Sequence, residues 1–309
     1  MLNLHPVGLE TALNLPVGRQ VPKLSKALPV RGKHILPRLP KTDMKNKISK
    51  IENDVQDRTS LAWKKLCAYV DKVAAENRDE FSPLEDLGQE LFAQIHTLPE
   101  TISTLTKVKK VWLYGSKLKC IPPEIGQMAA LEYFDPYTSY NLHWFPYEIT
   151  KCKNLKDSRV STRALYGNYK NRMGFPRLDH NPVRYSGDTV NCSICGKTMP
   201  YDQINQLWIS LMIGTDVLPL LANLCSMECE RNLPKPAEDY VQFPHKGGAD
   251  LKQPHDEDEL FELEMKEYEN EEKRNTEGTI QANKEEQELN RSTEKKDIPI
   301  IRLVRKIWE

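Results

Sequence analysis

Four of the seven cysteines in the chain fall into two close pairs whose spacing suits a metal ion. Cys192 and Cys195 are separated by two residues, Cys225 and Cys229 by three, and 29 residues lie between the pairs. Two such pairs of thiolates can surround zinc tetrahedrally, with zinc–sulfur bonds of about 2.3 Å. Because sulfur would fill all four positions, none would stay open for water or substrate. The spacing therefore predicts a structural zinc site rather than a catalytic one.

Short-range sequence signals predict how each pair is held. Gly196 follows the first pair and can adopt the left-handed backbone angles of a tight turn. Ser226 can cap a helix that places Cys225 just before its start and Cys229 in its first turn, where the helix dipole favours thiolate. The arrangement resembles a treble-clef zinc site, in which a knuckle and a helix start each supply two ligands. The sequence between the pairs is expected to build a small core around the metal from Trp208, Leu211, Met212, Leu218, Leu220 and Leu221.

Other uses of the cysteines are weaker interpretations. A redox role for the first pair alone would leave the second pair unexplained, and the βαβ setting of thioredoxin-like motifs is missing. Four unrelated buried cysteines are the plainest alternative. Of the remaining three, Cys152 falls at a core position of a repeat, Cys120 precedes a proline step and Cys67 lies in a predicted helix. Nucleophilic catalysis needs a thiolate beside a positioned base, and His143 is the only nearby candidate, so we expect no enzyme.

The sequence that precedes the cysteine pairs contains a pattern that repeats every 23 to 24 residues. Apolar–proline steps occur at Leu98-Pro99, Ile121-Pro122 and Phe145-Pro146. A fixed period of about 20 to 29 residues is typical of a leucine-rich repeat solenoid. Such a fold presents an extended surface rather than a reaction pocket. A set of unrelated amphipathic hairpins is the alternative, which the recurrence at several positions per unit disfavours.

Within the units, the pattern predicts short strands with one buried face. Val111 and Leu113 alternate with outward positions in the first unit, and Ser116 takes the place of the usual turn asparagine. The second unit has one extra residue and carries Pro136, which predicts an irregular strand because proline removes a ladder donor. The third unit keeps an apolar pattern as far as Leu165 and then degrades.

The predicted fold class is α/β: a short leucine-rich repeat solenoid with an N-terminal helical cap, a small zinc-binding module, and charged tails that are disordered or helical. So few repeats need a cap to cover their end face. Ser82 and Pro83 are a strong start signal for a cap helix that runs on through Ile95. The expected boundaries are 1–45 for a disordered basic arm, 46–97 for the helical cap, 98–186 for the repeats, 187–236 for the zinc module and 237–309 for an acidic tail with a terminal strand-like segment.

Charge is distributed unevenly although the formal net charge of the 309 residues is zero. Residues 1–50 hold ten basic and two acidic residues, whereas residues 238–297 hold nineteen acidic and nine basic ones. Such asymmetry suggests solvated or partner-binding ends. The sequence contains no run of 18 apolar residues, so we expect no membrane span. It also shows no pattern typical of a secretory signal. The odd, clustered set of cysteines argues against a disulfide framework, so a cytoplasmic location is expected.

Part of the chain resembles a bacterial leucine-rich repeat family of small cytoplasmic proteins. The resemblance covers about a quarter of the chain. It implies the repeat fold and no established biochemical role. The residues that carry it are Leu113-Tyr114-Gly115-Ser116, Ile121-Pro122-Pro123-Glu124-Ile125-Gly126 and Ser161-Thr162-Arg163-Ala164-Leu165-Tyr166-Gly167-Asn168.

The functional hypothesis is a non-enzymatic protein–protein interaction or adaptor protein with an unidentified protein partner and a structural zinc site. Aromatic and arginine residues on a rigid exposed strip are typical binding anchors. The alternative for Trp112 and Tyr114 is packing under the loop 136–144. A second hypothesis is a nucleic-acid-binding protein that uses the zinc module and the basic arm for phosphate contacts. The predicted partner-binding residues are the outward strand positions Lys110, Trp112, Tyr114, Tyr133, Asp135, Asp157 and Arg159.

Overall fold

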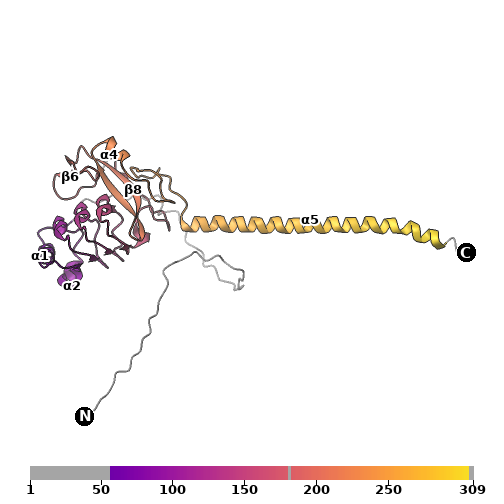
Figure 1. Ribbon diagram of the computed structural model, residues 1–309, viewed down its shortest axis with the longest axis horizontal. Helices are drawn as coiled ribbons and strands as arrows, with labels where there is room; N and C mark the ends of the chain where they lie inside the picture. Colours follow the sequence, from indigo (N-terminus) through magenta and orange to yellow (C-terminus); the bar gives the residue numbers. More distant parts are fainter. Residues whose placement is uncertain (1–55, 180–181, 306–309) are drawn as a thin grey trace, which may run out of the picture. The chain divides into compact units, whose positions relative to one another are not determined.

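The computed structural model describes residues 56–179 and 182–305, with side chains described as far as residue 292. This part of the chain is a mixed α/β structure with parallel and antiparallel sheets (Figure 1). The predicted basic arm 1–45 and the first residues of the predicted cap lie outside the described residues. Among the helices described, none combines the length and the apolar character needed to cross a membrane.

The repeating sequence forms a parallel sheet with strands in the order β1-β2-β3-β5. The strands are short: β1 Glu80–Phe81, β2 Lys110–Trp112, β3 Tyr133–Asp135 and β5 Asp157–Ser158. Lys110 lies opposite Tyr133, which lies opposite Asp157, so the sheet register follows the 23-to-24 period of the sequence. Pro136 falls after β3, and all three residues of that strand stay in register with β2. The predicted irregularity within this strand is therefore wrong, because the proline does not occupy a ladder position inside it.

A 3₁₀ helix follows each apolar–proline step at the same offset. These helices are η1 Glu100–Thr104, η2 Pro123–Gln127 and η3 Tyr147–Lys151. The proline before each has an extended backbone with φ between −68° and −73°, which its ring favours. One apolar residue of each helix, Ile102, Ile125 or Ile149, is buried in a common core with the strand residues Val111 and Phe134. The period of the sequence is thus a period of strand, turn and 3₁₀ helix.

The helices before the repeats differ from the predicted cap in several respects. Helix α1 runs over Leu61–Ala75, and the Ser60 hydroxyl caps it by accepting from the Trp63 N–H. The predicted second helix is divided into α2 Pro83–Leu87 and α3 Gln89–Phe92, because Gly88 between them has a φ of 75°. Ser82 makes no side-chain cap hydrogen bond. The two residues just before Ser82 form β1, which is a strand because it pairs in parallel with β2.

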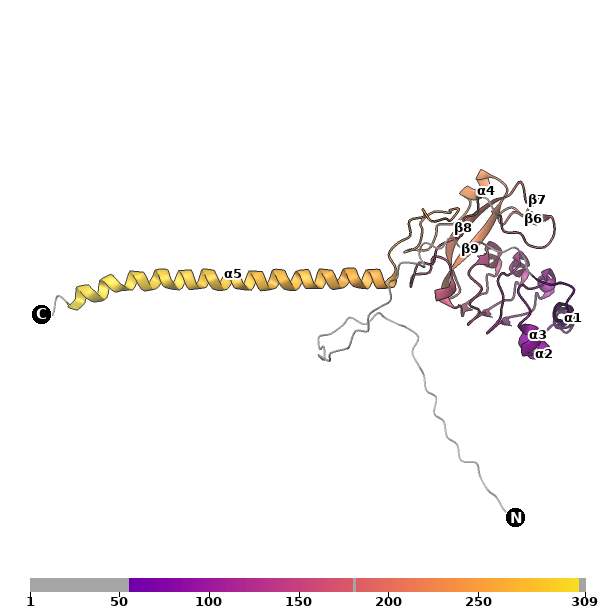
Figure 2. The same ribbon diagram turned by 180° about the vertical axis from the view of Figure 1, so that it is seen from behind.

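A second, three-stranded sheet has the order β4-β9-β8. Strands β8 Asn205–Ile213 and β9 Asp216–Leu224 pair antiparallel along their whole length, and β4 Phe145–Pro146 pairs with β9 in parallel. A small hairpin of β6 Thr189–Asn191 and β7 Thr198–Pro200 precedes them, and α4 Met227–Arg231 follows. These elements can be followed from behind in Figure 2. One hydrophobic cluster joins residues of the repeats with Leu207, Ile209, Leu218 and Leu220.

The long insert between the cysteine pairs forms only part of the core that was expected around the cysteines. Trp208 and Leu221 are fully buried in a separate aromatic cluster with Trp144, Tyr166 and Phe175, and Met212 is 62% exposed. Leu211, Leu218 and Leu220 pack in the cluster shared with the repeats. That cluster also holds Cys192 and Cys229, so the prediction is right for these three leucines and wrong for Trp208, Leu221 and Met212. The two faces of the β8–β9 hairpin bury themselves against different partners.

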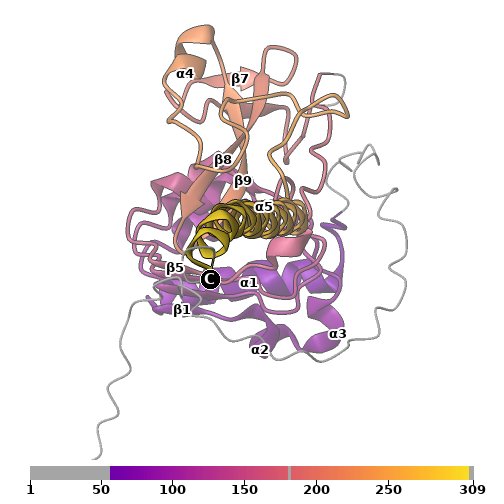
Figure 3. The same ribbon diagram turned by 90° about the vertical axis from the view of Figure 1, so that its right-hand side faces the viewer.

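Beyond the second sheet, helix α5 spans Glu257–Arg305 and is viewed end-on in Figure 3. Asp256 and Glu259 start it with reciprocal capping bonds: Asp256 accepts from the Glu259 N–H at 2.9 Å, and Glu259 accepts from the Asp256 N–H at 3.1 Å. The predicted strand-like segment 298–304 is wrong, since α5 continues through it. Extending an existing helix requires no new nucleus, so local strand preference is outweighed.

Candidate metal centre and exposed strand surface

The first cysteine pair lies on the turn that joins β6 to β7. The Cys192 N–H donates to the Lys197 carbonyl at 2.8 Å, and the Gly196 N–H donates to the Cys192 carbonyl at 2.9 Å. Gly196 has a φ of 75°, in the left-handed region that glycine adopts without strain. The predicted tight turn is confirmed, and it folds Cys192 and Cys195 toward the same side.

The second pair lies at the start of α4, directly after β9. The Ser226 hydroxyl caps this helix by accepting from the Cys229 N–H at 3.3 Å. Cys225 precedes the cap, and Cys229 is buried in the first turn. The predicted role of Ser226 is confirmed. A serine at the cap satisfies one of the N–H groups that the first helical turn leaves without a partner.

Together these elements bring four sulfur atoms into one cluster. The sulfur atoms of Cys192, Cys195, Cys225 and Cys229 all lie within 4.8 Å of one another. The Cys225 sulfur is 3.5 Å from that of Cys195 and 3.6 Å from that of Cys229. A tetrahedron with zinc–sulfur bonds of about 2.3 Å has edges of about 3.8 Å, so the spacing fits four thiolates around one ion. These four cysteines could hold a metal ion.

The electrostatics of the cluster favour a bound cation. Burial by itself would raise the pKa of Cys192, but N–H groups of Cys195, Ile194 and Cys225 directed at its sulfur lower that pKa from 9.0 to about 7. Hydrogen bonds from Cys225 to the neighbouring Cys195 and Cys229 raise the pKa of Cys225 to about 12. Thiols this crowded cannot all ionise unless a positive charge lies among them. The donor set therefore fits a cation that binds thiolate.

The β6–β7 turn, which carries Cys192 and Cys195, is attached to the rest of the fold through Ser193. Its N–H donates to the Asn223 carbonyl at 2.7 Å, and its hydroxyl accepts from the Asn223 N–H at 2.9 Å. The same hydroxyl bonds the buried carboxyl group of Glu148 on η3. Burial raises the pKa of Glu148, and its second oxygen has no hydrogen-bond partner in the described part of the chain. No local sequence pattern singles out Glu148, which only the pairing of β4 with β9 brings beside Asn223.

The predicted partner-binding residues lie on one face of the parallel sheet. Lys110 and Arg159 are exposed, Trp112, Tyr133 and Asp157 are partly buried, and Tyr114 is 54% exposed. The alternation predicted for β2 is confirmed, because Val111 and Leu113 are buried on the opposite face. We call the seven predicted residues, with the neighbouring Tyr137 and Glu80, the strand surface.

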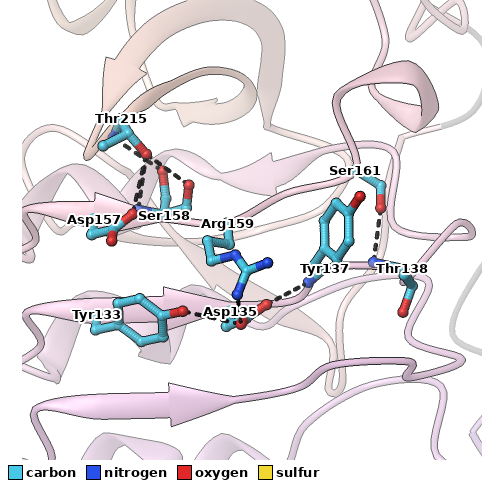
Figure 4. Close-up of polar contacts among 9 residues, drawn as sticks. All are labelled: Tyr133, Asp135, Tyr137, Thr138, Asp157, Ser158, Arg159, Ser161 and Thr215. Atoms are coloured by element: carbon cyan, nitrogen blue, oxygen red, sulfur yellow. Dashed lines mark hydrogen bonds and ion pairs between the residues drawn. The ribbon is translucent and has the colours of Figure 1, made fainter.

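Asp135 is the polar centre of the strand surface rather than an exposed anchor. Its side chain is 3% exposed and accepts from the Tyr133 hydroxyl at 3.1 Å and from the Tyr137 N–H at 3.0 Å. An Arg159 guanidinium nitrogen lies 3.5 Å from the same carboxylate, and that guanidinium also lies over the Tyr137 ring (Figure 4). These contacts position the groups around Asp135. Asp157 instead lies beside Thr215, with 3.4 Å between side-chain oxygens.

The structure separates the roles of Trp112 and Tyr114. The Trp112 ring lies 4.8 Å from the ring of Tyr133, and its N–H donates to Glu80 at 3.2 Å. Tyr114 keeps more than half of its surface in solvent, and its ring centroid lies 6.1 Å from that of Tyr137. Trp112 therefore packs and Tyr114 projects. Glu80 also pairs with Lys110 at 2.8 Å. It was not among the predicted surface residues, because it falls in the stretch predicted as helix.

The remaining candidate residues have local partners. Cys152 is buried in the core, where burial raises the pKa of its thiol to about 12. Cys120 is partly buried, with its sulfur 3.3 Å from the Thr97 hydroxyl, and Cys67 lies in α1. His143 bonds the Ala164 carbonyl at 2.6 Å and stacks near Tyr166. Each of these contacts is one that packing alone would produce.

Comparison with known proteins adds no further assignment. No protein-family model matches this chain, and no curated protein matches it. The resemblance to leucine-rich repeat proteins therefore stays a prediction. The nucleic-acid hypothesis also stays a prediction, because the basic arm on which it depends lies outside the described residues.

Proposed function

We propose that the four-cysteine cluster is a structural zinc site. The observation that supports this proposal is the fit of four sulfur atoms, with no other ligand type, to one tetrahedral ion. The site would join the β6–β7 turn to α4, which are both short elements. We also propose a reducing, cytoplasmic compartment, because an odd and clustered set of cysteines is typical of metal binding rather than of a disulfide framework.

Native mass spectrometry of the full chain, together with metal analysis, tests the zinc proposal. We expect one zinc ion per chain, loss of that ion in Cys229→Ser, and retention in the control Cys120→Ser, whose sulfur lies outside the cluster. Chelation should expose amides 187–200 and 225–233 to hydrogen exchange before those of the repeats. A chain that is fully folded and free of metal would exclude a structural role.

We further propose that residues 98–186 are a short leucine-rich repeat array and that the protein is a non-enzymatic interaction or adaptor protein. The strand surface carries this proposal. A parallel register holds aromatic, acidic and basic side chains in rows on a rigid sheet, and Tyr114 and Tyr137 project from it. Rigid aromatic anchors cost little conformational entropy when they bind.

Site-specific photo-crosslinking tests the interaction proposal. A photoreactive phenylalanine analogue replaces Tyr114 in one protein and Leu61 in a matched control, since Leu61 is an exposed residue of α1 away from the strand surface. We expect a defined protein adduct from position 114 only, and we expect Tyr114→Ala with Tyr137→Ala to abolish capture of that same protein. Equal adducts from both positions, or capture that survives the double substitution, would contradict the proposal.

A further inference from the structure

A cavity of about 760 Å³ lies where α5 begins, apart from the strand surface and the cysteine cluster. Its apolar walls are the rings of Tyr169, Tyr240 and Phe261 together with Leu260 and Pro254. Phe261 is 62% exposed and Leu260 is 49% exposed, although both are large apolar residues. Exposed apolar side chains gathered around a hollow are typical of a binding site.

The cavity is preformed, because Arg172 holds its walls together. The guanidinium of Arg172 donates to the carbonyls of Gly167, Asp239 and His255, at distances of 2.7–3.2 Å. It also lies 5.1 Å from the centre of the Tyr240 ring. The start of α5 is attached by the Glu257 N–H, which donates to the Tyr169 carbonyl at 2.8 Å. The loop of Gly167 and Arg172, two points in the connection between α4 and α5, and the start of α5 are thus fixed to each other around the hollow.

The charge of the lining favours a cation. Four carboxylates line the cavity, those of Glu238, Asp239, Glu257 and Glu264, against the single positive charge of Arg172. The Arg172 residue is 4% exposed, and its N–H groups are engaged by backbone carbonyls. His255 also lines the cavity, and its ring faces the carboxylate of Glu259 at 3.3 Å. A guest would therefore meet aromatic faces and a net negative rim.

We propose that this cavity is a docking site for a partner peptide that inserts an arginine side chain between apolar neighbours. A guanidinium is planar and weakly hydrated, so it can stack on tyrosine and phenylalanine rings while its edge meets carboxylates. The flanking apolar residues of the peptide would cover Leu260 and Phe261. Charge complementarity selects this class of partner, since an acidic or phosphorylated peptide would be repelled by the same rim.

Calorimetric titration of the full-length protein with two capped tripeptides tests the proposal. One peptide is Leu-Arg-Leu, and the other carries citrulline, which has nearly the same shape and no charge, in place of arginine. We expect the arginine peptide to bind about tenfold more tightly, because charge-assisted hydrogen bonds are roughly twice as strong as neutral ones. The difference should shrink as salt is raised, since the rim is exposed to solvent.

Variants identify the site. Glu238→Gln with Glu264→Gln keeps the volume of the lining and should weaken binding of the arginine peptide about fivefold, while Phe261→Ala should weaken it about threefold or more. Glu269→Gln on the same helix lies outside the lining and should change nothing. Circular dichroism should show all variants folded. Equal binding of the two peptides, unchanged binding to the paired glutamine variant, or no binding at millimolar concentration would each overturn the proposal.

Discussion

Protonation of His245 should weaken the fold at mildly acidic pH. Its Nδ1 atom accepts from the Gly247 N–H at 3.1 Å, so the neutral ring carries its proton on Nε2. Among the described residues Nε2 has no hydrogen-bond partner, and the ring meets Phe175 edge-to-face at 4.6 Å. Burial lowers the pKa of His245 from 6.5 to about 4. A second proton on this ring would be buried without an acceptor.

The sign and size of the effect follow from the lowered pKa. The unfolded chain takes up the proton below its pKa of 6.5, whereas the folded chain resists uptake until about 4. The stability that neutral His245 contributes is therefore fully present above the unfolded pKa of 6.5, and it is lost as the pH falls from 6.5 toward the folded pKa of about 4. The total is about 3 kcal/mol, and about 2 kcal/mol of it is lost between about pH 7.5 and pH 5.

Urea denaturation of wild type and His245→Gln at both pH values measures this loss. Glutamine can still accept from the Gly247 N–H, so the variant should be less stable at neutral pH and much less sensitive to acid. The control His255→Gln, at an exposed ion pair with Glu259, should keep the wild-type pH dependence. If wild type and His245→Gln lose the same free energy of unfolding between the two pH values, the assignment of acid sensitivity to His245 is wrong.

Four further substitutions test the packing of the strand surface, the burial of a carboxyl group and the close approach of two backbone segments. Trp112→Ala should lower the free energy of unfolding by about 1–3 kcal/mol, because it removes a ring contact and a hydrogen bond to a carboxylate. Tyr114→Ala should change the free energy of unfolding by less than about 0.5 kcal/mol. Equal losses for the two variants in urea denaturation would refute the distinction between them. Glu148→Gln should stabilise the fold by about 1–2 kcal/mol, and by more at pH 8 than at pH 5. The reason is that burial raises the pKa of Glu148 in the folded chain, so ionisation of this carboxyl group opposes folding as the pH rises. A stability difference that does not change with pH would contradict this. Gly126→Ala should cost about 1–3 kcal/mol in thermal or urea unfolding, since a Cβ there would lie 2.6 Å from the Glu148 carbonyl oxygen, and an unchanged midpoint would show that the backbone yields.

Much of the candidate metal site could be predicted because its determinants are local. The spacing of Cys192 and Cys195, the glycine after them and the serine between Cys225 and Cys229 each act within one turn of chain. The sequence could not show that Ser193 joins this loop to Asn223 and Glu148. That contact requires β4 and β9, about 75 residues apart, to pair first.

The face that carries the strand surface could also be predicted from local sequence. The burial of individual residues on that face could not, because it depends on distant parts of the chain. Alternation placed its residues on one face, because successive side chains in a strand point to opposite sides. Alternation says nothing about which of them a neighbour will cover. Asp135 is buried because Tyr133, Tyr137 and Arg159 all bond it, and two of these come from outside its own strand.

By itself the sequence determined the period of strand and 3₁₀ helix, the proline that opens each 3₁₀ helix and the two cysteine pairs, since each depends on backbone preferences of a few adjacent residues. Only the tertiary structure decided that the hairpin of β8 and β9 packs on the repeats, that Glu80 joins the sheet and that a cavity opens around Arg172. Those features depend on which distant surfaces bury each other. Burial is a property of the whole chain, and no short stretch of it carries that information.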